Sequence, residues 1–259
     1  MRKTYIIAVT YEKGGVGKTT TSVNVAAILA AKGYKTLIID LDPQSYATKY
    51  FGLYDSAALS LYNVMSKSAP AGEVIRNTKF ENLDILPATY ELEAIETELA
   101  AIPYGQEFIL KDALEQIKEK YNFILLDCPP SGMRIKTNAL CAAEYLILPT
   151  IPDDYAIAGL MKLSHTLNNI KRAVNPSLEV LGILINLDEN TANKKAYKKA
   201  LLEQTIFNCF KSVIRKNTTL SEAINANMPV NIYDINSNGA KDFIVLTDEI
   251  LKTLKKGIK

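Results

Sequence analysis

The chain has 259 residues, of which 48% are hydrophobic, which is enough apolar surface to bury a large core. Its net charge is only +2, so any affinity for nucleic acid has to come from a local patch rather than from bulk charge. The three cysteines are widely spaced and form no CxxC pair, which argues against a disulfide framework or a zinc site. The first strand begins by Thr4, which leaves no room for a signal peptide, and no apolar run approaches the roughly 20 residues needed to span a bilayer. We therefore expect a soluble, cytoplasmic protein.

Apolar runs and helical spacings alternate along most of the chain. Several of the apolar runs do not alternate with polar residues, which indicates strands that are covered on both faces. The expected strands are 5–9, 36–39, 83–86, 123–126, 145–148 and 180–185, and the expected helices are 23–29, 90–101, 105–119 and 156–173. This order predicts an α/β fold, a doubly wound and mainly parallel sheet flanked by helices. We expect one domain over residues 1–259, without an N-terminal helix-turn-helix domain.

A glycine-rich segment follows the first strand, at the edge of the sheet where ligands of such folds bind. Its glycines allow successive backbone N–H groups to turn inward around a phosphate, and the helix that follows directs its positive end at the same anion. Lys18 would reach the β- and γ-phosphates, and the Thr19 hydroxyl would bind Mg²⁺. A plain strand-to-helix turn explains the glycines but not the Lys-Thr pair. The candidate nucleotide-binding residues here are Gly14, Gly15, Val16, Gly17, Lys18, Thr19 and Thr20.

Carboxylates follow two of the expected strands. Asp40 and Asp42 come after the second strand, and alternation along an extended segment puts both on the same side. Asp127 ends an apolar strand in the Walker B form and would hold a Mg²⁺-bound water. Phosphoryl transfer needs such a metal site and a group that orients the attacking water. The alternative for Asp40 and Asp42 is that they cap the next helix.

The phosphate segment departs from the ordinary pattern in one respect. Glu12 stands where a glycine is usual, and Lys13 adds a second lysine at the mouth of the loop. This form resembles the deviant Walker A motif of the ParA/MinD superfamily. The resemblance implies that Lys13 crosses a dimer interface to the partner's nucleotide, so that ATP binding and dimerisation are coupled. The alternative is a solvated loop cation.

Further motifs carry the same resemblance over almost the whole chain. The segment 40–44, Asp-Leu-Asp-Pro-Gln, is similar to a family motif in which Asp40 supports Mg²⁺ through its water shell and Asp42, a catalytic residue, positions the attacking water. Residues 45–48, Ser-Tyr-Ala-Thr, stand where the family commonly has Gly-Asn-Ala-Thr. Residues 227–230, Asn-Met-Pro-Val, resemble a Gly-x-Pro-Val signature, with asparagine in place of the glycine. The resemblance implies that Asn186, Pro229 and Val230 line the adenine pocket.

The basic excess of the chain is concentrated between residues 186 and 220. This segment carries seven positive and three negative side chains, a local charge of +4, while the whole chain has only +2. Such a surface is either an ordinary solvated helix face or a site for sequence-independent binding to phosphates. The resemblance favours nonspecific DNA binding by an ATP-bound dimer. The candidate DNA-binding residues are Lys194, Lys195, Lys198, Lys199, Lys211, Arg215 and Lys216, of which Arg215 matches the family position best.

Two functions remain open at this point. The first is a nucleoid-associated partition ATPase that uses ATP and Mg²⁺, forms a homodimer and works with a ParB-like centromere-binding partner. The second is a membrane-cycling ATPase of the MinD type, which would use the basic and apolar tail over residues 250–259. We expect the apolar residues of that tail to pack on the core, which makes a membrane the less favoured partner.

Overall fold

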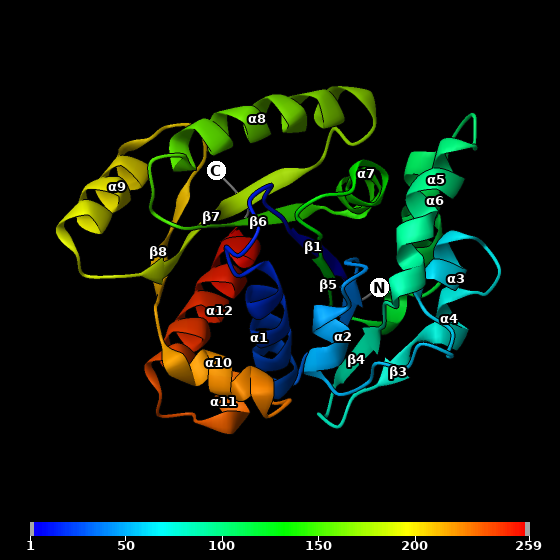
Figure 1. The fold of residues 1–259 in the computed structure, drawn as a ribbon, viewed down its shortest axis with the longest axis horizontal. Helices are drawn as coiled ribbons and strands as arrows, with labels where there is room; N and C mark the ends of the chain where they lie inside the picture. Colours follow the sequence, from blue (N-terminus) through cyan, green and yellow to red (C-terminus); the bar gives the residue numbers. More distant parts are fainter. Residues whose placement is uncertain (1–2, 257–259) are drawn as a thin grey trace.

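The computed structural model describes residues 3–256, and their strands form one eight-stranded sheet (Figure 1). Its strand order is β3-β4-β2-β5-β1-β6-β7-β8, and all neighbours are parallel except the antiparallel pair β3–β4. The strands are β1 (Tyr5–Val9), β2 (Thr36–Asp40), β3 (Arg76–Asn77), β4 (Leu83–Leu86), β5 (Phe123–Asp127), β6 (Tyr145–Thr150), β7 (Glu179–Asp188) and β8 (Cys209–Arg215). The predicted fold class is therefore confirmed.

Helices cover both faces of this sheet. Successive residues of β1 enter different cores, since Ile6 and Ala8 pack with α3–α9 whereas Ile7 and Val9 pack with α1, α2 and α10–α12. Burial on both sides explains why the strand sequences are apolar throughout. The helices are α1 (Lys18–Ala31), α2 (Tyr46–Tyr50), α3 (Leu61–Met65), α4 (Ala71–Val74), α5 (Ile95–Ala100), α6 (Ile109–Glu115), α7 (Met133–Ala142), α8 (Ala156–Ala173), α9 (Ala192–Glu203), α10 (Thr218–Asn225), α11 (Val230–Tyr233) and α12 (Asn238–Lys256).

The sequence interpretation placed the main strands correctly but missed or misjudged several other elements. The first helix begins at Lys18, directly after the glycine loop, so it extends five residues beyond the apolar spacing that starts at 23. The segment 105–119 is not one helix, since only Ile109–Glu115 is α-helical and short 3₁₀ turns flank it. Strand β8 was not predicted, because it lies at the sheet edge and alternates buried with exposed residues.

Helix α12 closes the free edge of β8. The Glu249 carboxylate accepts hydrogen bonds from the backbone N–H groups of Lys211 (2.8 Å) and Ser212 (2.9 Å), which have no strand partner. The apolar residues Phe243, Leu246, Ile250 and Leu254 of the same helix are buried in the core. The last residues of the expected tail, 257–259, lie outside the described residues. Within residues 3–256, no helix has the length and hydropathy required to cross a membrane.

Candidate functional site

The order of the strands places the glycine-rich loop at the centre of the sheet. Strand β1 lies between β5 and β6. Strand β2 lies on one side of β1 and β6 on the other, so the order of the strands reverses at β1. The carboxyl ends of β1, β2 and β5 therefore bring together the loop 10–17, Asp40 and Asp127. This is the point of a doubly wound sheet at which ligands bind.

The glycine loop leads directly into the N-terminus of α1. Gly15 (φ 73°) and Gly17 (φ 85°) have left-handed backbone conformations, and Gly17 precedes the first helical residue. A Cβ atom on Gly17 would lie 2.1 Å from Nδ2 of Asn186, so any other residue there would displace the Asn186 side chain. No side chain caps the first turn of α1, which leaves its N–H groups free to bind an anion.

Lys18 is buried beneath the loop. Its Nζ donates a hydrogen bond to the carbonyl oxygen of Lys13 at 3.2 Å, so the ammonium group lies inside the curve of the loop. Burial lowers the pKa of Lys18, and the nearby carboxylate of Asp127 opposes that shift. A phosphate bound in the loop would supply a second negative partner for this ammonium group.

Asp40 and Asp127 are neighbours at the ends of adjacent strands, and both side chains are buried. Burial, followed by repulsion between the two groups, raises the pKa of Asp127, and burial is also the main reason that the pKa of Asp40 is raised. Oδ1 of Asp127 accepts a hydrogen bond from the Ser22 hydroxyl at 2.9 Å, whereas Oδ2 has no partner among the described residues. Such an oxygen is suited to bind a cation or a water molecule held by one.

The donor set fits Mg²⁺ rather than a metal held only by protein side chains. The described residues contain no cluster of three His, Cys, Asp or Glu groups that could enclose a metal ion. Mg²⁺ usually keeps several waters and binds one or two carboxylates together with substrate phosphates. Asp127 and the Thr19 hydroxyl, beside the phosphate loop, match that requirement.

Asp40 and Asp42 have different surroundings. Oδ2 of Asp40 accepts hydrogen bonds from both the backbone N–H (2.8 Å) and the hydroxyl (2.7 Å) of Thr48, which lies within α2. Its Oδ1 accepts the N–H of Asp42 at 3.2 Å. Asp42 instead lines the cavity above the loop. The geometry therefore makes Asp40 a residue that positions the 42–48 segment, and it leaves Asp42 facing the site.

A cavity of about 580 Å³ extends from the phosphate loop to α2 and to the end of α10. Its size is that of sites for small molecules. Of the three residues expected around the adenine, Asn186 lies behind the loop, where its Nδ2 donates to the carbonyl oxygen of Val16 at 2.8 Å. Val230 is fully buried in the core, and neither it nor Pro229 is among the cavity residues. The walls on that side are formed instead by Tyr46, Lys49, Tyr50, Ile224, Asn225 and Asn227.

Lys13 at the mouth of the loop forms an ion pair with Asp153 of its own chain. The neighbouring Glu12 pairs with Lys162 of α8 at 2.7 Å. The Lys13 side chain is nevertheless 48% exposed, so it is held at the surface and not enclosed. The sequence interpretation missed Asp153, because nothing in the local pattern relates two residues so far apart in the chain.

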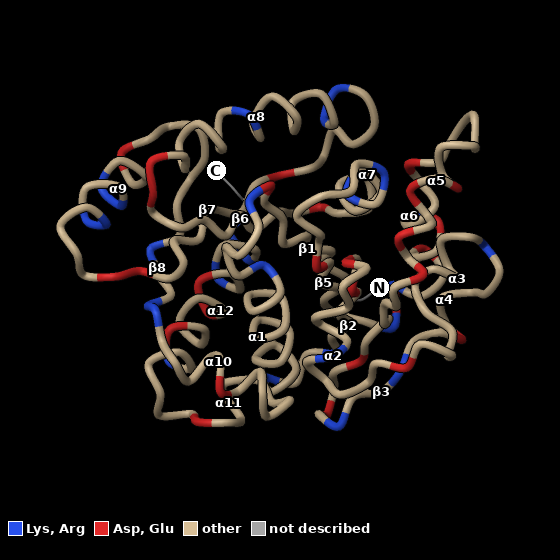
Figure 2. The backbone as a smooth tube through the Cα atoms, in the orientation of Figure 1, with Lys and Arg blue, Asp and Glu red and all other residues tan. Residues whose placement is uncertain are grey.

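The basic segment folds into a groove of about 990 Å³ between α9 and the end of β8. Figure 2 shows Lys and Arg positions gathered on α9 and along β8. Five of the seven candidate residues line the groove, whereas the Lys194 side chain donates to the carbonyl oxygen of Pro152 (2.8 Å) and Lys211 lies outside. Several groove cations have acidic partners, namely Lys198 with Asp188 (2.5 Å), Lys216 with Glu189 (2.5 Å) and Arg215 with Asp242 (2.6 Å).

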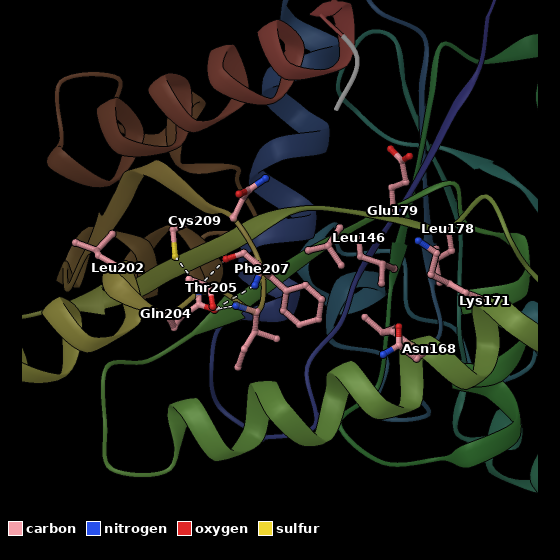
Figure 3. Close-up of a pocket in the computed structure, with 14 residues that line it drawn as sticks. Leu146, Asn168, Lys171, Leu178, Glu179, Leu202, Gln204, Thr205, Phe207 and Cys209 are labelled. Atoms are coloured by element: carbon pink, nitrogen blue, oxygen red, sulfur yellow. Dashed lines mark hydrogen bonds between the residues drawn. The ribbon is translucent and has the colours of Figure 1, made fainter. Parts of the chain in front are cut away.

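A further cavity of about 580 Å³ lies between α8 and the start of β8, away from the phosphate loop (Figure 3). The Gln204 amide on its wall is already paired, donating to the carbonyl oxygen of Phe207 at 2.6 Å and accepting from the N–H of Ile206 at 2.6 Å. These bonds stabilise the turn between α9 and β8. No group of this cavity belongs to the candidate site.

The doubly wound sheet and the Lys-Gly-Gly-Val-Gly-Lys-Thr loop define a P-loop nucleoside triphosphatase of the deviant Walker A type. A family model described as an AAA domain matches residues 4–180. The chromosome partitioning protein ParA of Myxococcus xanthus is 34% identical over 257 residues, and the match covers 95% of this chain and 88% of that protein. The sporulation initiation inhibitor protein Soj of Bacillus subtilis is 36% identical over 251 residues, and the match covers 95% of this chain and 97% of that protein. The chain belongs to the ParA/Soj family of partition ATPases.

Solved structures share the fold over the whole chain. The structure of cobyrinic acid a,c-diamide synthase from Mycobacterium smegmatis, with a bound ATP analogue and magnesium, matches with a TM-score of 0.86 and 27% identity. The match covers 99% of this chain and 98% of that one. Shared fold alone does not transfer an activity, so the function has to be argued from the site.

Proposed function

We propose that this chain is a Mg²⁺-dependent ATPase that dimerises with ATP, binds DNA without sequence preference in that state, and partitions DNA with a ParB-type partner. The observation that carries the proposal is the pairing of a deviant phosphate loop with a basic groove in one chain. Membership of the ParA/Soj family supports it, as does the presence of an ATP analogue and magnesium in a solved structure of the same fold.

In this proposal the residues of the loop bind and orient the nucleotide. The N–H groups of 14–20 surround the phosphates, and the buried Lys18 ammonium neutralises the β- and γ-oxygens. Thr19 and Asp127 would hold Mg²⁺, which neutralises charge on the phosphates when bound. Asp42, which lines the cavity, orients the attacking water. ATP hydrolysis is slow if no arginine of the same chain stabilises the negative charge of the phosphates in the transition state.

Dimerisation requires Lys13 to exchange partners. In the described structure its ammonium group pairs with Asp153, and the proposed dimer places it against the phosphates of the other subunit. A triphosphate carries more negative charge than the single carboxylate of Asp153, so ATP favours the exchange. Nucleotide state and assembly are thereby coupled.

The basic groove is the proposed DNA-binding surface. Lysine and arginine side chains that contact phosphates release counterions from DNA, which gives affinity without base readout and a strong dependence on salt. The acidic partners of Lys198, Arg215 and Lys216 offset part of this affinity in one subunit. Two grooves in a dimer double the number of phosphate contacts, so binding is expected to need the ATP state.

The burial of α12 favours this function over a membrane-cycling one. Phe243, Leu246, Ile250 and Leu254 already pack in the core, so the described part of the helix has few apolar side chains left to insert into lipid. In contrast, a membrane-cycling ATPase that binds lipid through its C-terminal helix would not use the basic groove.

The direct test compares binding to random-sequence duplex DNA and to anionic liposomes, each with ATP, ADP and no nucleotide. ATP-dependent, salt-sensitive DNA binding without liposome binding is expected, and Lys18→Ala should lose it. Lipid binding without DNA binding would contradict the partition function while leaving the ATPase assignment in place.

A further inference from the structure

Helix α9, which carries three of the lysines that line the basic groove, is held to the rest of the chain mainly by polar contacts. It lies at the outer edge of the molecule (Figure 1), and Leu201 is its only buried residue. The half-buried residues of the helix are Lys194, Tyr197 and Lys198, which share one helix face with Leu201 by their spacing. The inner face of α9 is therefore polar over its first two turns.

Two of these inner residues contact the loop between β6 and α8. The Lys194 ammonium group donates a hydrogen bond to the carbonyl oxygen of Pro152 at 2.8 Å. A hydrogen bond to the Asp154 carboxylate raises the pKa of the Tyr197 hydroxyl. Because little apolar packing holds the helix, its position depends on where the loop 152–154 lies.

The middle residue of that loop is the partner of Lys13. One oxygen of the Asp153 carboxylate pairs with Lys13, and the other accepts the N–H of Tyr155 at 3.1 Å, at the turn into α8. The Asp153 side chain is only 22% exposed, so the departure of Lys13 would leave a largely enclosed carboxylate without its cation. An enclosed charge without a partner is costly, and the loop has to shift until Asp153 reaches water or another cation.

The arrangement of α9 in the described structure keeps one of its lysines away from a DNA backbone. The Lys194 ammonium group is occupied by the carbonyl oxygen of Pro152 instead of facing solvent. Release from the loop frees this ammonium group and lets the helix adjust to the phosphates that it meets. Both changes favour binding to a polyanion.

We propose that the loop 152–154 restrains α9 while Lys13 is paired with Asp153, and that the departure of Lys13 to the nucleotide of a second subunit releases the helix for DNA binding. Lys194 and Tyr197 are then positioning residues of the groove. ATP acts on the groove of each subunit in this way, in addition to bringing two grooves together. The DNA consequence rests on the proposed function, whereas the link between Lys13 and α9 lies within a single chain.

The link is tested by hydrogen exchange of the α9 amides, measured by mass spectrometry on the full chain without nucleotide. Lys13→Ala should increase exchange over residues 192–203 by roughly 3- to 10-fold, the effect of about one hydrogen bond, because the loop no longer holds the helix. Glu12→Gln is the matched control, since it removes the neighbouring ion pair to Lys162 and no contact of the loop, and it should leave α9 unchanged. In a Lys194→Met background the effect of Lys13→Ala should shrink, because one of the two contacts is already absent.

The DNA consequence is tested with Tyr197→Phe, which removes the hydroxyl contact with Asp154 without changing the charge of the groove. By fluorescence anisotropy, the nucleotide-free variant should bind random-sequence duplex DNA about 3-fold or more tightly than the unchanged chain. Tyr62→Phe removes a similar bond, 2.8 Å long, to Glu98 on the other side of the sheet, and it should leave the affinity unchanged.

The outcomes separate this inference from the proposed function. If Lys13→Ala leaves the exchange of α9 unchanged, or has the same effect in the Lys194→Met background, the link is wrong even for a chain that dimerises with ATP and binds DNA. If α9 responds but Tyr197→Phe binds DNA no more tightly than the unchanged chain, the loop does not restrain DNA binding. A chain that shows the link but binds no DNA in any nucleotide state contradicts the proposed partition function instead.

Discussion

Replacing Gly17 by alanine is expected to destabilise the protein and to abolish nucleotide binding at the same time. Gly17 has a φ of 85°, and the new Cβ would lie 2.1 Å from Nδ2 of Asn186. Asn186 would have to move, which breaks its 2.8 Å hydrogen bond to the carbonyl oxygen of Val16. The substitution therefore strains the loop and removes the contact that supports it from behind.

The size of the effect follows from these two contributions. A left-handed conformation costs a non-glycine residue about 1–2 kcal/mol. Losing the Asn186 bond and leaving a buried acceptor unpaired adds about 1–3 kcal/mol. A total of about 3 kcal/mol corresponds to a decrease in melting temperature of roughly 6–12 °C for a chain of this size.

The assay is thermal unfolding with and without ATP and Mg²⁺, and Gly14→Ala is the matched control. Gly14 has no atom within 4 Å of an added Cβ, so its substitution should change the free energy of unfolding by less than about 0.5 kcal/mol. In an Asn186→Ala background, Gly17→Ala should cost only the backbone strain, about 1–2 kcal/mol. Equal effects of the two glycine substitutions, or full additivity with Asn186→Ala, would refute the reasoning.

Three further predictions concern the basic groove, the metal site and the lysine of the loop. Arg215→Ala should weaken DNA binding, measured by fluorescence anisotropy, and lower the slope of log affinity against log salt concentration by about 1 per subunit. Substitution of the exposed Lys111 on α6 is the control and should change neither the affinity nor the slope. An unchanged slope for Arg215→Ala would show that Arg215 does not contact DNA. Without Mg²⁺, the free energy of unfolding should decrease as the pH rises above the ordinary aspartate range, because the raised pKa values of Asp40 and Asp127 mean that the folded state holds the more protons. Asp127→Asn should flatten that decrease in thermal scans between roughly pH 5 and pH 8, and a slope identical to that of the unchanged chain would show that these carboxylates do not cause it. Lys18→Ala should lower the affinity for ATP by at least about 10-fold in a filter-binding assay, because it removes the charge-assisted hydrogen bonds to the phosphates, and unchanged affinity would show that the phosphates bind elsewhere.

The sequence predicted the central part of the fold because its signals there are local. The strands β1, β2 and β5 are continuous apolar runs, each followed by the residues of the candidate site. The apolar spacing alone did not reach the start of α1 at Lys18, since the first turn of that helix is made of polar residues. Strand β8 was missed for a different reason, because at the sheet edge its buried residues alternate with half-buried or exposed ones.

The parts of the site that the sequence could not predict depend on contacts between distant residues. The ion pair of Lys13 with Asp153 and the support of the loop by Asn186 both join segments more than a hundred residues apart. Family resemblance directed attention to Pro229 and Val230, while the cavity wall is formed by residues of α2 and by Ile224, Asn225 and Asn227, just before them.

The most direct test of the account is the mass of the protein in solution, measured by light scattering with a non-hydrolysable ATP analogue and Mg²⁺, with ADP, and for the Lys13→Ala variant. The account predicts a dimer with the analogue, a monomer with ADP, and a monomeric Lys13→Ala variant that still binds the analogue. A mass that is independent of nucleotide, or a Lys13→Ala variant that dimerises as readily as the unchanged chain, would contradict it.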